Sequence, residues 1–403
     1  MSKPLRILAI VNLAWDPRFG AARVWIEMAE EWSKAGHVVE KFCLTDAFPV
    51  AASSPAKAAL RLMMFPLRAM KFVRRHRERF DVIDALVGTL PFTKRSLRFE
   101  GLLVARSVGL YRLYEKFERA AAKRWPPSSR GRLPGRMFYS FFNERARAAS
   151  EASVRNCDLL NLPNSDELLC VREEMKSTKA AVVLPYGLAP ARRQALRAAA
   201  APAEIRWRKK KISFIGMWSP RKGAKDWREI IQRVRSSVPD VSFLFLGTMT
   251  ANENVMADLD PAMAGWVEII PQFEPDQLPQ LLSDCGVGAF PSYVEGFGLA
   301  VVEQLAAGIP TVAYAAPGPR DILRDSLPEL LVPTGNVARF SETIIEIFTK
   351  DLGAYQALAD RSAETAARFS WPEIAQATVD EYRARLEGAA SSGPTISSGD
   401  ANS

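Results

Sequence analysis

The sequence predicts an α/β protein with two successive doubly wound units, each built on a parallel sheet. Apolar runs typical of buried strands alternate with helical spacing along most of the chain. This alternation pauses over residues 189–208 and restarts at Lys211. The chain has 403 residues, of which 48% are hydrophobic, so it is long enough for two or three cores.

The first half opens with a β-loop-α-β pattern. Leu5–Leu13 is an apolar run that we expect to be a buried strand, and Ala21–Ala35 has helical spacing that ends at Gly36. We expect the other strands of this half at Val38–Leu44, Phe80–Val87, Gly101–Arg106, Cys157–Leu162 and Ala180–Leu184. Tyr111, Tyr114 and Phe117 have helical spacing, which favours core packing over an acceptor site.

The second half repeats the pattern. Strands are expected at Lys211–Gly216, Val241–Gly247, Trp266–Pro271, Val287–Pro291 and Thr311–Ala315. Helices are expected at Asp226–Val238, Pro275–Asp284, Gly298–Ala307 and Trp371–Leu386. Two such units imply a cleft between them, because parallel sheets bind ligands at the carboxyl ends of their strands.

These segments give the expected domain organisation. Residues 1–188 would form the first domain, 189–208 a linker, 209–370 the second domain, 371–388 a final helix and 389–403 a disordered tail. Four scattered cysteines without a C-x-x-C pair favour reduced thiols and a cytoplasmic protein. We expect no signal peptide and no membrane-spanning run.

The sequence lacks the motifs that several other classes of enzyme require. The chain has two histidines, His37 and His76, which disfavours a histidine triad or a zinc site. Asp258 and Asp260 form a D-x-D, but three residues match by chance often. Neither G-x-x-x-x-G-K-[ST] nor G-x-G-x-x-G occurs, so ATPase and hydride-transfer functions have no phosphate loop.

Positive charge is concentrated in residues 51–150, which hold 22 Lys and Arg against 7 Asp and Glu, while the whole chain carries a net charge of +9. Residues 57–80 interleave apolar and basic side chains. This segment is either a basic amphipathic helix that lies on an anionic membrane or a surface helix packed on its own domain. Nucleic acid is disfavoured, because no nucleic-acid-binding motif accompanies the charge.

The most informative stretch runs from Pro291 to Gly318. A strand ends at Pro291, a glycine-bearing loop holds Glu295, and a helix then begins near Gly298. The free N–H groups of a helix start favour a phosphate. Glu303 lies inside this helix and points back toward its start. Two carboxylates beside a phosphate are well placed to accept hydrogen bonds from sugar hydroxyls. The alternative is a surface loop and a helix whose Glu is solvated.

The motif E-G-F-G-L-A-x-x-E-x-x-A-x-G-x-P resembles the E-x7-E signature of retaining glycosyltransferases of the GT-B fold, family 4. FGAARVWIEMAEEWSKAGHVVEKF resembles the family's glycine loop, first helix and second strand. LPYGL, GMWSPRKG and FSWPEIA resemble its interdomain turn, its G-R-x(4–5)-K-G loop and its last helix, which crosses back onto the first domain.

The resemblance implies roles for individual residues. Lys222 and Glu295 would be the catalytic pair, with Lys222 on the diphosphate and Glu295 on the hydroxyls of the donor sugar. Glu303 would bind the ribose hydroxyls. The remaining substrate-binding residues would be Gly20, Arg221, Gly223, Gly296, Phe297, Gly298 and Leu299. No metal or cofactor is expected, because the donor, a UDP-, GDP- or ADP-sugar, is a co-substrate and a cation and a helix terminus stabilise its diphosphate.

The sequence departs from the family pattern at three positions. Met217 stands where the family usually has Arg, so that Arg221 is the one available substitute, with a solvated loop cation as the alternative for Arg221. Val108 stands where many members have His. The N-terminal loop has Ala21 beside Gly20 where two glycines are common. These departures leave two possibilities open, an unusual donor or a weakened or lost activity.

We therefore expect a retaining transferase that moves a sugar from a nucleotide diphosphate sugar to a hydroxyl of a glycan or lipid-linked acceptor. The basic first domain favours envelope polysaccharide or lipopolysaccharide assembly and a location in the cytoplasm or on the inner face of the membrane. A non-catalytic GT-B relative that acts as a binding or scaffold subunit is the alternative. A nucleotide-sugar epimerase or a phosphorylase of similar fold is a second alternative.

Overall fold

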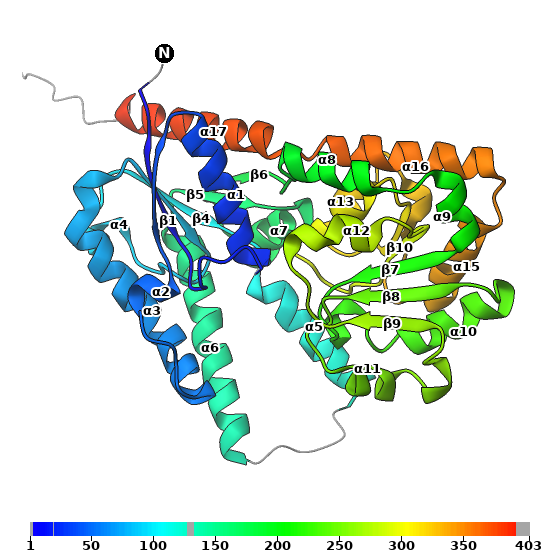
Figure 1. Cartoon of the computed structure of the whole chain (residues 1–403). Coiled ribbons are helices and arrows are strands. Elements are labelled where there is room, and N and C mark those ends of the chain that lie inside the picture. Colours follow the sequence, from blue (N-terminus) through cyan, green and yellow to red (C-terminus); the bar gives the residue numbers. More distant parts are fainter. Residues whose placement is uncertain (1–2, 19, 127–132, 392–403) are drawn as a thin grey trace, which may run out of the picture.

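Two lobes lie side by side, and each is built on a six-stranded sheet (Figure 1). The structure is a computed structural model that describes residues 3–18, 20–126 and 133–391. The strand order is β2-β1-β3-β4-β5-β6 in the first sheet and β12-β11-β10-β7-β8-β9 in the second. The pairings along both sheets are parallel, so the predicted pair of doubly wound units is confirmed.

The first sheet lies within the ranges that the apolar runs predict. Its strands are β1 Arg6–Ile10, β2 Val38–Phe42, β3 Val82–Leu86, β4 Leu102–Arg106, β5 Leu159–Leu162 and β6 Ala180–Val183. The helices of this domain are α1 Gly20–Lys34, α2 Leu44–Ala47, α3 Pro55–His76, α4 Lys94–Leu97, α5 Tyr111–Arg124, α6 Leu133–Asn156 and α7 Ser165–Leu169. The domain also has a 3-10 helix, η1 Arg77–Arg79, and a short π-helix, η2 Cys170–Glu174.

The second sheet has strands β7 Lys211–Ile215, β8 Ser242–Leu246, β9 Val267–Ile270, β10 Val287–Phe290, β11 Thr311–Tyr314 and β12 Leu331–Val332. Its helices are α10 Trp227–Ser237, α11 Asn252–Asp258, α12 Leu278–Leu282, α13 Leu299–Ala306, α14 Pro319–Leu323, α15 Val337–Phe348 and α16 Leu352–Ala367. Short turns are η3 Pro220–Lys222, η4 Pro261–Met263, η5 Pro275–Gln277 and η6 Pro328–Leu330. The single helix expected at Pro275–Asp284 is thus divided into η5 and α12.

Residues 189–208 are a correction to the sequence analysis, because the expected linker is largely helical. It forms α8 Pro190–Ala199 and α9 Ala203–Lys209, and α8 packs against α12 and α13 of the second domain. The segment is rich in Ala and Arg, which favour helix, but two short helices separated by a break show no continuous period. Proline lies at the first helical position of α8, where its missing N–H is tolerated.

The last helix, α17 Trp371–Ser391, runs along the top of the molecule and returns to the first domain (Figure 1). It packs on α1, where the indole N–H of Trp32 donates to the carbonyl of Ala375 at 3.3 Å. The hydroxyl of Tyr382 contacts a buried ion pair between Arg106 and Asp84. The helix is longer than expected and includes residues 389–391; the remainder of the expected tail lies outside the described residues.

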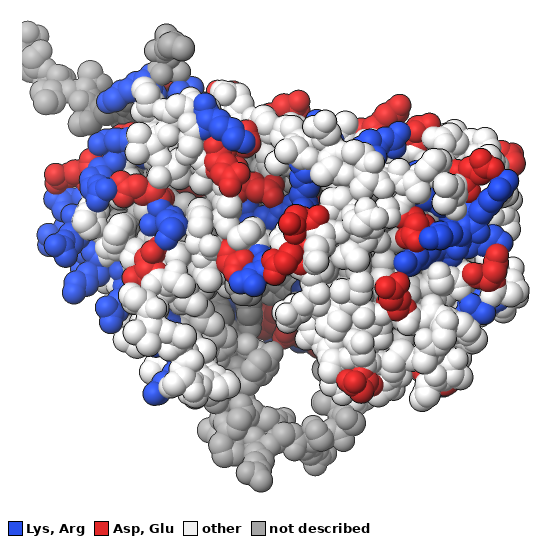
Figure 2. Space-filling model, viewed as in Figure 1, with Lys and Arg blue, Asp and Glu red and all other residues white. Residues whose placement is uncertain are grey.

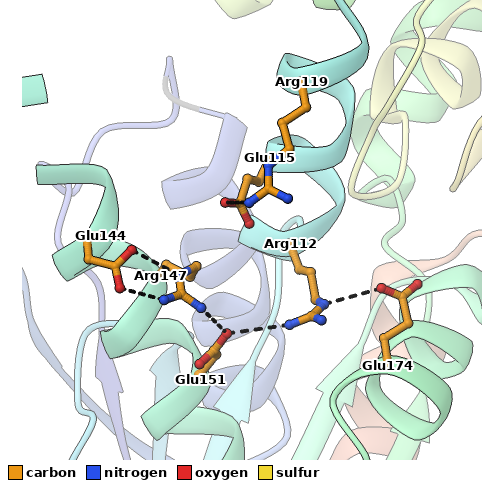
Figure 3. A network of polar contacts seen from close by, with 7 residues as sticks. All are labelled: Arg112, Glu115, Arg119, Glu144, Arg147, Glu151 and Glu174. Atoms are coloured by element: carbon orange, nitrogen blue, oxygen red, sulfur yellow. Dashed lines mark hydrogen bonds and ion pairs between the residues drawn. The ribbon is translucent and has the colours of Figure 1, made fainter. Parts of the chain in front are cut away.

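Helix α5 connects the two domains on the opposite side of the molecule. Ion pairs anchor it to α6 and η2, since Arg112 contacts both Glu151 and Glu174 in the network drawn in Figure 3. Near the middle of the helix, the ring of Phe117 lies 5.6 Å from that of Tyr293 in the second domain. The pairs of this network are partly exposed, so each adds little stability alone. Together they fix the direction in which α5 crosses between the domains.

Candidate functional site

The site lies where loops leave the carboxyl ends of β7 and β10. The turn η3 follows β7, and the loop that holds Glu295 follows β10. Gly223 has a φ of 83°, and a Cβ there would lie 2.3 Å from the carbonyl oxygen of Pro291. Only glycine therefore allows η3 to pack against the end of β10, which places Lys222 beside the glycine-bearing loop.

Lys222 and Glu295 form an ion pair, with Nζ 2.6 Å from Oε1. Burial lowers the pKa of Lys222, and the attraction of Glu295 opposes that shift. The Arg221 guanidinium is 3.5 Å from the same carboxylate oxygen, donates to the carbonyl of Val294 and stacks on the ring of Tyr114. Two cations thus converge on the first carboxylate of the motif.

The start of α13 faces the same loop. Gly298 is its N-cap with a φ of 100°, a conformation that favours glycine, and no side chain caps the N–H groups of this first turn. Leu299 is the first helical residue and is partly buried. Such a terminus can bind an anion.

Glycine at position 296 is required by the neighbouring domain. A Cβ on Gly296 would lie 2.0 Å from the carbonyl oxygen of Val108, which is backbone of the first domain. The side-chain amide of Asn164 donates to the carbonyl of Gly296. Phe297 is buried and packs on the rings of Tyr186 and Phe369. The loop that holds Glu295 and Gly296 therefore lies against the first domain.

Glu303 is buried between two arginines. Its Oε1 accepts hydrogen bonds from Arg23 at 2.9 Å and from Arg192 at 2.8 Å. Burial alone would raise the pKa of Glu303, but the two guanidinium groups outweigh it and hold the pKa below its usual value. Arg23 also contacts Glu27 at 2.5 Å within α1. The ionised carboxylate of Glu303 on α13 thus accepts hydrogen bonds from both α1 and α8.

The structure brings most of the predicted site residues together. Lys222, Glu295 and the start of α13 meet around one loop, and Gly296 touches the first domain. Gly20 is different: it begins α1 and is exposed, and a Cβ added there would meet no atom within 4 Å. It lies three residues before Arg23, so it is near the arginine that reaches Glu303.

Two residues that the sequence analysis missed are Arg23 and Arg192. One signal for Arg23 was present: a cation in the first turn of a helix opposes the helix dipole, so it needs a compensating partner. Arg192 lies in the segment that we expected to be a linker. Tyr114 was expected in the core, and it is partly buried, with its ring against Arg221 of the second domain.

Met217 stands where the family pattern has Arg, and it is apolar and 48% exposed, so it supplies no cation to the site. Among residues 3–18, 20–126 and 133–391, no group of three or more His, Cys, Asp or Glu side chains is arranged to hold a metal ion. Within the same residues, the longest apolar stretch of any helix is insufficient to span a bilayer.

Charge is distributed differently over the two lobes (Figure 2). Basic side chains gather along the outer edge of the first domain, over α3 and α4, and charges of both signs lie near the boundary between the lobes. On α3 the buried side is formed by Phe65, Ala69 and Val73, as the packed-helix alternative expects. Leu60 and Leu67 of the same helix are nevertheless more than half exposed.

Comparison with known proteins agrees with this geometry. Residues 199–367 match the family model "Glycosyl transferases group 1". A D-inositol 3-phosphate glycosyltransferase of Mycobacterium marinum is 30% identical over 186 residues, which are 44% of this chain and 39% of that protein. The chain therefore matches about two fifths of the length of that curated relative, and the family model covers most of the second domain.

Solved structures extend the likeness to the whole fold. WaaG, a glycosyltransferase involved in lipopolysaccharide biosynthesis, has a TM-score of 0.69 at 15% identity and covers 93% of this chain and 99% of its own. HepE of Anabaena, in complex with UDP and glucose, has a TM-score of 0.64 at 16% identity and covers 94% and 100%. At these identities the likeness shows the GT-B type of fold, which confirms the predicted fold class.

Proposed function

We propose that this protein is a retaining glycosyltransferase that moves a sugar from a nucleotide diphosphate sugar to a hydroxyl of a glycan or lipid-linked acceptor. The observation that carries the proposal is the pairing of Lys222 with Glu295 beside the uncapped start of α13. A cation and free N–H groups there suit a diphosphate, and carboxylates suit sugar and ribose hydroxyls. The group 1 match of residues 199–367 supports the same chemistry.

In the proposed reaction, the bond between the anomeric carbon and the diphosphate oxygen breaks. The acceptor oxygen forms its new bond on the same face of the sugar, and its proton passes to the departing diphosphate. Lys222 and the start of α13 stabilise the negative charge that develops on the diphosphate. Glu295 orients the donor sugar by accepting hydrogen bonds from its hydroxyls, and Glu303 does the same for the ribose.

The acceptor would approach from the first domain, whose α3 presents an exposed mixture of apolar and basic side chains. Leu60, Met64 and Leu67 are exposed on the first part of the helix, and Lys71 and Arg75 on the part that follows. This combination suits the interface of an anionic membrane. Together with the likeness to WaaG, it supports an acceptor in bacterial envelope polysaccharide or lipopolysaccharide assembly.

Donor turnover tests the proposed activity. The full chain is incubated with UDP-, GDP- and ADP-sugars, and release of the nucleoside diphosphate is measured with and without candidate glycan and lipid acceptors. We expect one donor to turn over and the anomeric configuration of the product, measured by NMR, to match that of the donor. An inverted product would contradict the retaining mechanism while leaving the transferase activity intact.

The exposed Met217 favours a second candidate, a non-catalytic relative that binds a nucleotide or a partner subunit. The same panel of UDP-, GDP- and ADP-sugars distinguishes this candidate from an active transferase. Binding of a nucleotide without turnover of any donor supports the binding subunit. An epimerase or a phosphorylase is excluded by release of UDP, GDP or ADP together with a glycosylated product.

Sedimentation with vesicles tests the membrane proposal. The triple variant R74Q, R75Q and R77Q, and a variant with K71Q and R75Q on the exposed side of α3, should lose binding to vesicles of anionic lipid. A matched control is K209Q with K210Q, on the second domain. Equal binding by all variants and by the wild type would contradict a role for α3.

A further inference from the structure

The site has fewer cations for a diphosphate than the family pattern would supply. Met217 provides none, and the guanidinium of Arg221 is occupied by the ring of Tyr114, the carbonyl of Val294 and the carboxylate of Glu295. Lys222 is itself paired with Glu295. Another positive group near Glu303, the carboxylate proposed to bind the ribose, would therefore supply a charge for the diphosphate that the second domain does not provide.

Arg23 is such a group, and it comes from the other domain. Its side chain lies in the first turn of α1 and is 12% exposed. Its Nη1 reaches Glu303 and its Nε reaches Glu27. Its Nη2 is buried and has no hydrogen-bond partner among the described residues. A buried donor without a partner lowers stability, so an acceptor supplied by a ligand would be favourable there.

Arg192 provides an internal comparison, because it contacts the same carboxylate. Its Nε and Nη2 lie 2.8 Å from Oε1 of Glu303, and its Nη1 donates to the carbonyl of Pro275 at 2.7 Å. All three of its nitrogens are thus engaged. Of the two arginines on Glu303, Arg23 is the one with a nitrogen left for a ligand.

We infer that Arg23 is a phosphate-binding residue whose Nη2 donates to the diphosphate of the nucleotide when Glu303 holds the ribose. This inference rests on the proposed function. The ribose of a nucleotide carries its first phosphate on the 5′ carbon, across the ring from the 2′ and 3′ hydroxyls that Glu303 would hold. A long cationic side chain beside Glu303 can therefore extend toward the phosphate oxygens. A guanidinium matches the geometry of phosphate and stays charged. The arginine crosses the domain boundary, so a bound diphosphate would contact both domains.

The test compares a nucleoside diphosphate with its own nucleoside, since the nucleoside keeps the ribose and lacks the phosphates. The full chain is titrated calorimetrically with the diphosphate that stabilises the wild type, from UDP, GDP and ADP, and then with the matching nucleoside. We expect R23Q to weaken binding of the diphosphate at least tenfold more than binding of the nucleoside. R192Q, the matched control, should weaken both by similar factors.

R23K retains a positive charge and should recover part of the lost diphosphate affinity, which also guards against a folding defect in R23Q. If R23Q weakens the diphosphate and the nucleoside equally, Arg23 acts only through Glu303 and the inference is wrong. In another outcome, the wild type binds the diphosphate more tightly than the nucleoside while R23Q keeps the same ratio of the two affinities. That result overturns the inference but leaves the proposed function intact. A wild type that binds neither contradicts both.

Discussion

Lys222 and Glu295 come from loops 73 residues apart in sequence, and their side chains meet at 2.6 Å. The family resemblance implies different ligands for them, the diphosphate and the donor sugar. Their contact compensates the charge of a largely buried lysine, since an unpaired charge at such a site would be costly. A diphosphate would then compete with Glu295 for the ammonium group.

The first prediction concerns Lys222 as the cation for the diphosphate. K222M should lower the kcat of donor turnover by about a hundredfold to a thousandfold, the effect expected when a charge-stabilising donor is removed. The matched control is K225M, because Lys225 is three residues away and pairs with Asp258 near the surface. Steady-state kinetics of both variants check the prediction, and equal rates for K222M and the wild type would contradict it.

The second prediction uses two glycines of the site. G296A should disrupt the domain interface, because the added Cβ would lie 2.0 Å from a backbone carbonyl oxygen of Val108 that has little freedom to move. G20A meets no atom within 4 Å and should leave the melting temperature within about one degree. Calorimetric melting of the two variants checks this. Unchanged stability in G296A would show that the domains are not in contact there.

The third prediction concerns the anchor of α17. Y382F removes a hydroxyl that is bonded to the buried pair of Arg106 and Asp84, so the free energy of unfolding should fall by about 1–3 kcal/mol. Tyr355 offers a matched control, since its hydroxyl donates to the carbonyl of Gly286 and Y355F leaves no buried charge without a partner. Urea unfolding of both variants measures the difference, and a smaller loss in Y382F than in Y355F would be inconsistent with the anchor.

The fourth prediction concerns Glu167, which is buried under the loop that contains Val108. Burial raises the pKa of Glu167 to about 8, while its Oε1 accepts a hydrogen bond from the backbone N–H of Leu110. The folded state thus binds a proton that the unfolded state releases near its ordinary pKa of 4.5.

Between these two pKa values the stability should fall as the pH rises, by up to about 1.4 kcal/mol for each pH unit. E167Q cannot ionise and should lack this part of the pH dependence. Thermal unfolding of both proteins from pH 5 to pH 9 provides the comparison, and parallel curves would show that Glu167 is ionised in the folded protein.

The fold was largely predictable because strands and amphipathic helices leave local patterns. Leu5–Leu13 contains β1, and the helix expected from Gly298 is α13. The motif also located Lys222 and Glu295, whose pairing depends on the ends of two adjacent strands. These features follow from residues close together in sequence or from the order of the strands.

The partners of Glu303 were not predictable in the same way. Arg23 is 280 residues away and Arg192 is 111 residues away, and neither belongs to the motif. Their contacts depend on how the two domains and α8 pack. The helices α8 and α9 were missed because each is too short to show a clear hydrophobic period.

Binding of a nucleotide through Glu303 is the most direct test of the proposed donor site. The melting temperature of the wild type and of E303Q is measured with UDP, GDP and ADP, since a ligand that binds the folded state at a hundred times its Kd adds about 2.7 kcal/mol. We expect one nucleotide to raise the melting temperature of the wild type and to have little effect on E303Q. The absence of a shift in the wild type with all three, or an equal shift in E303Q, would contradict a nucleotide site at the start of α13.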